Sequence, residues 1–422
     1  MQTELQALRQ QAAAPQQMQV LPVTTDSTVV AEDTGEAVLY TSEELAAEVK
    51  KHMWMKGDYK IVPYGSLWGS ASFDSQRSFP GAFVLFNYSA TNQNQDAFNL
   101  DTRRSRLGLD VTGPRVPWFC DANSRAKVEI DFHGQFVEKE NQATIQIRHA
   151  YAEVYDDQFR LLGGQTWDLH SPLVPHTVNY SVGWGGGNIG FRRMQLRYER
   201  YLACSDVFLI TPAIAACQNV VVDGPAAGRE PTDWPVMEGR VGFTFGERGE
   251  GCKPIVFGIS GHVGEQGFDF LPLSDSRVRT WSVNADVVIP ITDRFSFQGE
   301  FFTGADLSTY MGGIVQGVDF FRREAIYSTG GWFEFGYDLT DNLHTYTGYT
   351  IDDPWNDTIS PGGDVLIGNG ARVYNRSLFA NVIFDVTKKI KFGLEVSSWD
   401  THYLVRQPGE SLRFEFAGQY DF

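Results

Sequence analysis

The chain has 422 residues, of which 42 are glycine and 14% are aromatic, and its formal net charge at pH 7 is −17. An acidic balance of this size excludes nucleic acid as a partner, because proteins bind phosphate backbones through clusters of basic residues. The mean hydropathy is −0.26 and no apolar run is long enough to cross a bilayer as a helix, which excludes a helical membrane protein.

Residues 1–57 differ from the rest of the chain. Leu5 and Leu8 lie in a Gln/Ala-rich stretch and predict the end of a helix, with the end of a coiled coil as an open alternative. Residues 17–40 show no periodicity and predict a flexible segment. Thr41 and Glu44 match a capping box that opens a short amphipathic helix. Polar residues follow Met1 directly, so we expect the sequence to be a mature or trimmed form of an exported protein.

From residue 58 to the end, apolar and polar side chains alternate with a period of two. One apolar face and one charged face are the pattern of strands that have hydrocarbon on one side and water on the other. We count sixteen such strands, an even number, near residues 60–73, 100–112, 124–136, 143–156, 158–168, 190–201, 205–214, 238–247, 254–264, 278–289, 294–304, 324–338, 341–351, 372–386, 388–400 and 410–422. A soluble propeller is disfavoured because no Trp-Asp repeat is present, and a sandwich because the polar faces carry so many charges.

The sequence therefore predicts an all-β fold: a 16-stranded antiparallel transmembrane β-barrel over residues 58–422. The short N-terminal helical segment, residues 1–57, is expected at the periplasmic mouth, with plugging of the barrel as the alternative. Connections after even-numbered strands are short and those after odd-numbered strands are long, which is the asymmetry of barrels in the bacterial outer membrane. Cys120, Cys204 and Cys252 then fall at periplasmic turns, where a disulfide between two of them is conceivable.

The last strand places aromatic residues at every second position and ends on Tyr420 and Phe422. This register resembles the C-terminal signal that the barrel assembly machinery reads in outer-membrane proteins. We therefore expect that machinery, outer-membrane lipids and lipopolysaccharide to be partners of the chain.

Three stretches carry a further resemblance: residues 105–109 (SRLGL), residues 148–168, which contain RHAYAEV and LLGGQTWD, and residues 190–199 (GFRRMQLRYE). They resemble the second, fourth, fifth and sixth strands of the DcaP-like porins, relatives of the phosphate-selective porins O and P. The resemblance implies a homotrimeric diffusion channel with an N-terminal coiled coil and an inward-folded third loop. The matching constriction loop here is 169–189, and its candidate residues, with the residue before it, are Asp168, His170, His176, Gly185 and Gly187.

A barrel of sixteen strands leaves a lumen too wide for its own side chains to fill, so a narrowing must set its selectivity. The polar faces of strands two to six supply the candidate pore-lining residues Arg104, Arg106, Lys127, Arg148, Arg193 and Arg197, together with Glu129, Asp131 and Glu199. Later strands supply the acidic residues Asp286, Glu300, Glu334, Asp385, Glu395 and Glu415. We hypothesise that a basic wall faces an acidic one and sets up a transverse field, the alternative being ordinary lumen polarity with internal ion pairs.

The predicted function is a passive outer-membrane porin for small hydrophilic solutes, with anions favoured by the arginine-rich wall. No cofactor is expected. No metal is expected either, because His170 and His176 lack a third ligand in the sequence pattern. The Gly185-x-Gly187-x-x-Gly190 pattern opens no helix and is not a nucleotide site. The alternatives are a structural or adhesive barrel with an occluded lumen and, less favoured because no catalytic constellation is present, an outer-membrane hydrolase.

Overall fold

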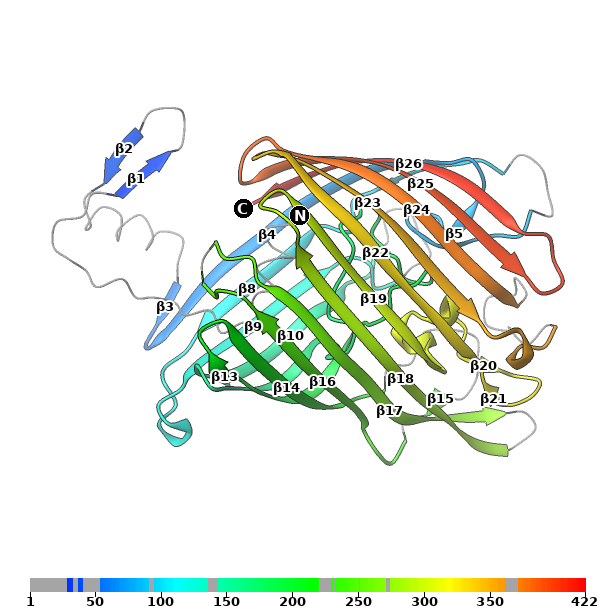
Figure 1. Ribbon diagram of the computed structural model, residues 1–422, viewed down its shortest axis with the longest axis horizontal. Helices are drawn as coiled ribbons and strands as arrows, with labels where there is room; N and C mark the ends of the chain where they lie inside the picture. Colours follow the sequence, from blue (N-terminus) through cyan, green and yellow to red (C-terminus); the bar gives the residue numbers. More distant parts are fainter. Residues whose placement is uncertain are drawn as a thin grey trace.

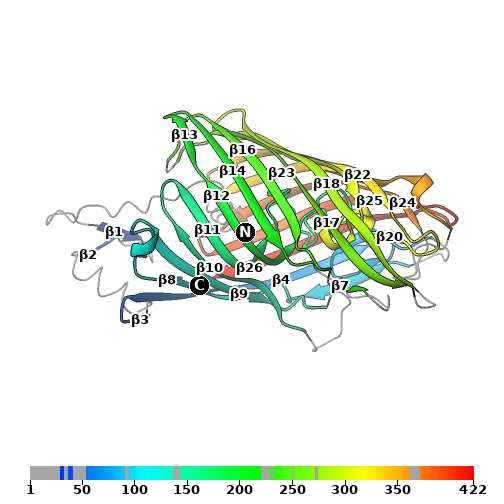
Figure 2. The ribbon, with the colours of Figure 1, turned by 90° about the horizontal axis from the view of Figure 1, so that it is seen from below.

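The computed structural model describes residues 29–32, 37–40, 54–90, 95–135, 143–219, 229–230, 232–249, 251–270, 274–361 and 371–422. Sixteen antiparallel strands close into one barrel, and they cross it obliquely in two perpendicular views (Figure 1, Figure 2). This confirms the predicted all-β transmembrane barrel. No helix among the described residues is long and apolar enough to pass through a bilayer.

Short strands that pair with the same neighbour act as one barrel strand; β7 and β8, for example, both pair with β4. The barrel strands are β4 (Tyr59–Asp74), β7 (Ala97–Asp101) with β8 (Arg106–Thr112), β9 (Asn123–Asp131), β10 (Gln146–Tyr155), β11 (Phe159–Trp167), β12 (Arg192–Arg200) with β13 (Leu202–Ser205), β14 (Phe208–Cys217), β15 (Arg229–Glu230) with β16 (Val236–Phe245), β17 (Ile255–Phe270), β18 (Ser274–Pro290), β19 (Phe295–Ala305), β22 (Tyr327–Thr340), β23 (Leu343–Pro354), β24 (Arg372–Asp385), β25 (Ile390–Tyr403) and β26 (Gly409–Asp421).

The remaining elements are short. They are β1 (Val29–Glu32), β2 (Ala37–Tyr40), β3 (Trp54–Lys56), β5 (Ser78–Pro80), β6 (Val84–Asn87), β20 (Val318–Asp319), β21 (Glu324–Ala325) and the 3-10 helices η1 (Pro117–Phe119), η2 (Ser308–Tyr310), η3 (Gly313–Val315) and η4 (Asn356–Thr358).

The barrel closes where the last strand, β26, pairs with the first, β4. The amide of Phe422 donates to the Gly65 carbonyl at 3.0 Å, and the Gly65 amide donates to the Phe422 carbonyl at 3.1 Å. A Cβ atom on Gly65 would lie 2.4 Å from Cζ of Phe422, so the absent side chain makes room for the terminal ring. The tyrosine and phenylalanine of the predicted assembly signal, Tyr420 and Phe422, therefore lie at the seam of the barrel.

The two faces of each strand have opposite chemistry. On β12, Met194 and Leu196 are 52% and 64% exposed, whereas Arg193 on the opposite face is 1% exposed. On β25 and β26, Leu394 and Phe416 are exposed on the outside and Glu395 and Glu415 are buried inside. The residues outside form the apolar band that lipid requires, and the polar residues line the interior.

The two ends of the barrel differ in their connections. The turns between β10 and β11, β18 and β19, β22 and β23, and β24 and β25 take only a few residues, and they lie at one end. Longer connections, among them residues 75–96, 168–191 and 306–326, lie at the other end. Cys120, Cys204 and Cys252 lie at the end with short turns, as predicted, and in the described structure they are free thiols, as is the buried Cys217.

The N-terminal segment is described only in part. Residues 17–40 were predicted to be a flexible segment, but the described residues among them form the antiparallel pair of β1 and β2. The two predicted helices, around Leu5 and over residues 44–53, lie outside the described residues. Strand β3 pairs with β4, so structure continuous with the barrel begins at Trp54.

Candidate functional site

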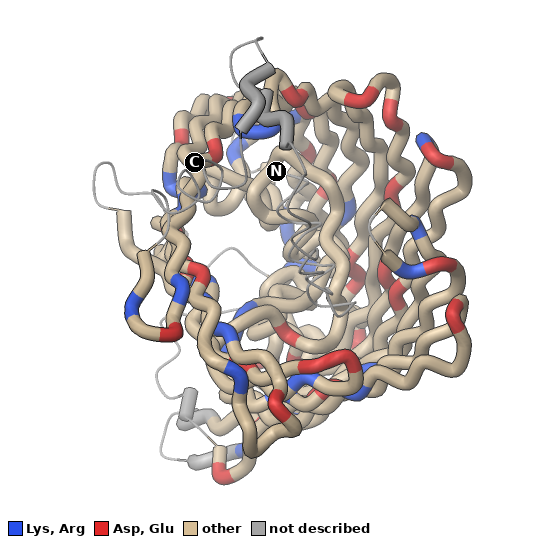
Figure 3. The backbone as a smooth tube through the Cα atoms, turned by 90° about the vertical axis from the view of Figure 1, so that its left-hand side faces the viewer, with Lys and Arg blue, Asp and Glu red and all other residues tan. Residues whose placement is uncertain are grey.

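Three loops from the long-connection end fold back into the barrel. We call them L1 (residues 75–90), L3 (residues 168–191) and L6 (residues 306–326); viewed along the barrel, chain segments lie inside the ring of strands (Figure 3). Their apolar side chains pack on one another in a cluster formed by Ala82, Phe83, Leu85, Phe86, Val174, Tyr180, Val182, Trp184, Phe191, Met311, Ile314 and Val315. The sequence predicted only the third loop here. L1 and L6 were missed, although the apolar run Phe83–Phe86 within a loop was a signal for one of them.

L3 is fastened to the barrel wall through its backbone. Each of four buried glutamates on different strands accepts a hydrogen bond from a main-chain amide of the loop. The pairs are Leu169 with Glu238 of β16 at 2.7 Å, Leu173 with Glu300 of β19 at 2.6 Å, His176 with Glu334 of β22 at 2.7 Å, and Val178 with Glu395 of β25 at 2.6 Å. Three of these glutamates were assigned to an acidic pore wall. In the structure they hold the loop instead.

These anchors predict a local effect of substitution. Glu395→Ala leaves the buried Val178 amide without its acceptor, which costs about 1–3 kcal/mol of local stability. Hydrogen exchange of the amides at residues 176–179 should accelerate accordingly. Glu395→Gln is the matched control, because its side-chain carbonyl still accepts, and it should change the exchange much less. Unchanged exchange in Glu395→Ala would show that the anchor does not hold the loop.

The basic wall on β8 to β12 is largely paired. Arg148 bridges Glu129 and Asp131, with 2.7 Å to each carboxylate. Tyr180 of L3 donates its hydroxyl to the same Asp131 at 3.2 Å, and burial together with that carboxylate raises the pKa of Tyr180, so the hydroxyl stays a donor. The predicted alternative, lumen polarity with internal ion pairs, is therefore realised at these residues.

The same holds for the next part of the wall. Lys127 lies 3.0 Å from Asp110, and its ammonium sits over the ring of Tyr64. Arg197 donates to Gln195 at 2.8 Å and forms an ion pair with Glu199 at 3.4 Å.

Two arginines differ, because no ion pair joins them to any carboxylate in the described part of the chain. Arg104 donates to the Val178 carbonyl of L3 at 2.7 Å and lies over the ring of Trp68. Arg106 follows on β8 and is half-buried. Of these two, Arg104 is buried, so Arg106 is the one whose unpaired charge is partly exposed.

An ion pair between Asp168 and Arg193 joins the beginning of L3 to the strand that follows it. Nε of Arg193 lies 2.5 Å from one Asp168 oxygen and Nη2 lies 3.0 Å from the other. Nη2 also donates to the Thr309 carbonyl of L6 at 3.2 Å, and the guanidinium stacks over Tyr310. This arginine, predicted to line the pore, thus joins L3 to L6 and is buried.

The two loop histidines do not converge. His176 contacts Glu334 through Nδ1 and stacks on Tyr346, with ring centroids 4.4 Å apart. His170 instead packs among His262, Tyr310 and Glu238 on the opposite part of the wall.

Gly185 and Gly187 let the tip of L3 lie close to the backbone of L1 and of the barrel wall. Their φ angles are +70° and +126°, a region that side chains rarely adopt. A Cβ atom on Gly187 would lie 2.3 Å from the Gly331 carbonyl oxygen, and the Gly185 carbonyl accepts from Asn375 at 2.7 Å. The two glycines thus allow close contact between the loop backbone and neighbouring backbone.

A cavity remains between L3 and the wall of β10 to β16. It has a volume of about 100 Å³ and is partly open to solvent. Its lining combines both charges with aromatic rings, and includes His149, Arg160, Trp167, Arg197, Glu199 and Arg240. Such a mixture suits small polar solutes better than apolar ones.

No protein-family model matches the chain, and no curated protein sequence is significantly similar to it. Solved structures are similar in fold. The outer-membrane channel DcaP of Acinetobacter baumannii is 18% identical, with 87% of this chain and 99% of that chain covered and a TM-score of 0.67. The anion-selective porin of Comamonas acidovorans is 9% identical, with 86% and 100% covered and a TM-score of 0.53. OprB of Pseudomonas putida is 11% identical, with 90% and 97% covered and a TM-score of 0.53.

These likenesses show a shared fold. Together with the apolar exterior and the closed sixteen-strand ring, they show that the chain has the β-barrel fold of outer-membrane porins.

Proposed function

We propose that the protein is a passive diffusion channel for small hydrophilic solutes, with a preference for anions. The observation that carries the proposal is the cavity beside L3, which is lined by charged side chains inside a barrel whose exterior is apolar. Charged residues on the inner wall are not required for a closed barrel to be stable in lipid. They are typical of barrels that enclose a water-filled passage.

The preference for anions rests on Arg104 and Arg106, whose charges no carboxylate neutralises by an ion pair in the described structure. Two similar folds belong to proteins described as an outer-membrane channel and an anion-selective porin. Kinship with the DcaP-like and phosphate-selective porins, a homotrimeric assembly, contacts with lipopolysaccharide, and recognition of Tyr420 and Phe422 by the barrel assembly machinery belong to the same proposal.

Recordings in planar bilayers test it. The purified protein should insert as discrete conductance steps whose reversal potential in a salt gradient shows anion preference. Arg106→Gln removes an unpaired lumen charge and should shift the reversal potential toward cations, because the local positive potential falls.

Arg115→Gln is the matched control. Arg115 is an exposed arginine at the short-turn end that lies 3.5 Å from Asp121, so its loss should leave the reversal potential unchanged. Equal reversal potentials for wild type and Arg106→Gln would remove the basis for anion preference.

An occluded structural barrel is the second candidate, because the apolar cluster of L1, L3 and L6 fills part of the lumen. It would give no conductance steps in the same recordings although the protein inserts. The absence of steps from inserted protein would overturn the channel proposal.

A further inference from the structure

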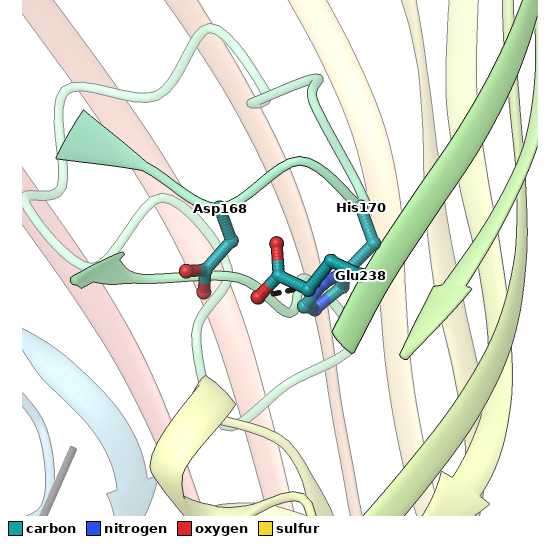
Figure 4. A group of neighbouring side chains, drawn as sticks. All are labelled: Asp168, His170 and Glu238. Carbon is teal, nitrogen blue, oxygen red and sulfur yellow. Dashed lines mark ion pairs between the residues drawn. The ribbon is translucent and has the colours of Figure 1, made fainter. Parts of the chain in front are cut away.

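One side-chain cluster inside the barrel offers ligand atoms that the proposed channel does not use. Asp168 and His170 at the start of L3 meet Glu238 of β16, and one donor atom from each lies within 4.8 Å of the others (Figure 4). The three residues are 4%, 0% and 1% exposed. Asp168 and His170 are two residues apart in L3, whereas Glu238 lies on β16, about 70 residues later. This cluster was therefore not predicted from the sequence.

Several donor atoms in this cluster are buried without a hydrogen-bond partner. Neither ring nitrogen of His170 has one within the described structure, and Oε1 of Glu238 lacks one as well. The nearest approach between them, from Nδ1 of His170 to Oε1 of Glu238, is 3.7 Å, too long for a hydrogen bond. Leaving such groups unsatisfied in a buried site is costly, so their convergence points to a missing binding partner.

The outer contacts of the two carboxylates are already in place. Asp168 accepts hydrogen bonds from Arg193 and from the Phe191 amide at 2.8 Å, and Glu238 accepts one from the Leu169 amide through its other oxygen. Carboxylates that ligate metals are themselves held by such hydrogen bonds. The two carboxylates and Arg193 leave one net negative charge, which a cation would offset.

We propose that Asp168, His170 and Glu238 form a binding site for a divalent transition-metal ion of the zinc type. One imidazole nitrogen and two carboxylate oxygens are ligands that zinc accepts, whereas calcium and magnesium need more oxygen ligands than the cluster offers. Ligands of a tetrahedral zinc ion lie roughly 3.3 Å apart, so the three side chains need to close by about 1.5 Å or less. Asp168 and His170 line the cavity beside L3, so the cluster borders that cavity.

The site goes beyond solute diffusion. A bound ion would tie the first residues of L3 to β16 at the point where Leu169 already bonds to Glu238. The position of the constriction would then depend on metal as well as on the hydrogen bonds of the loop.

Metal titration of the intact chelator-treated protein in detergent tests the proposal. Cobalt as a spectroscopic probe should give ligand-field absorption that zinc abolishes, and calorimetry with zinc should show one tight site per chain. His170→Gln and Glu238→Gln should each weaken binding by at least about tenfold. His176→Gln is the matched control, since that histidine contacts Glu334 and lies outside the cluster.

Heat-modified mobility in gel electrophoresis shows whether each variant is folded. Absence of a cobalt signal from the folded wild type would overturn the proposal, as would equal binding in wild type and both variants, which indicates a surface site. Because the readout is spectroscopic and calorimetric, its failure leaves the conductance result, and hence the proposed channel, untouched.

Discussion

Replacing Arg413 with methionine should lower the free energy of unfolding by about 3–5 kcal/mol, because it leaves buried carboxylates without their counter-charge. Arg413 is 1% exposed on β26 and lies 2.7 Å from Asp74 and 3.0 Å from Glu415. It also donates to the Ala82 carbonyl of L1 at 2.8 Å, so one side chain holds both the seam of the barrel and a lumen loop. Urea titration of the folded protein in lipid measures the loss.

Arg376→Met is the control for that experiment. Arg376 lies 3.0 Å from Asp400 in a similar pair, but its side chain is 49% exposed, and such pairs contribute only up to about 1 kcal/mol. If both substitutions lowered the free energy of unfolding equally, burial would not be the reason that the ion pairs of Arg413 stabilise the barrel.

Gly187→Ala should release the tip of L3 from the wall. The φ angle of +126° costs a side chain about 1–3 kcal/mol. The new Cβ would also lie 2.3 Å and 2.5 Å from the carbonyl oxygens of Gly331 and Ile351, and neither strand backbone can move aside cheaply. We expect the loop to undock, with higher and noisier single-channel conductance than the wild type and a barrel that still folds.

Gly69→Ala on β4 is the control, since nothing lies within 4 Å of a Cβ there and its φ angle is ordinary. It should leave conductance unchanged. A Gly187→Ala channel that matches the wild type in conductance and noise would show that the tip of L3 does not narrow the passage.

The alternation of apolar and polar side chains was enough to predict the barrel, because a two-residue period identifies the residues that face lipid. It placed Arg193 and Glu395 inside and Leu196 and Leu394 outside, as the structure has them. It could not say what each inward residue contacts. The partners of the wall glutamates are main-chain amides of L3, and a main-chain amide has no sequence signature.

The sequence also did not predict the inward folding of L1 and L6 or the cluster around Glu238, because these too depend on contacts between distant parts of the chain. The inward folding of L1 and L6 depends on packing between loops that are far apart in the chain, and Glu238 meets His170 only because β16 stands opposite the neck of L3. His170 and His176 lie only six residues apart in L3, and the sequence offered no third ligand beside them. The curvature of the loop sends them to different strands.

The hydrogen bonds that anchor L3 to the barrel also limit when the loop can reach its final position during folding. Leu169 takes its acceptor from a residue 69 positions later, and Val178 from one 217 positions later, on the next-to-last strand of the ring. The loop cannot be seated until those strands stand beside one another. The complete set of four glutamate acceptors is therefore available to L3 only when β25 is in place.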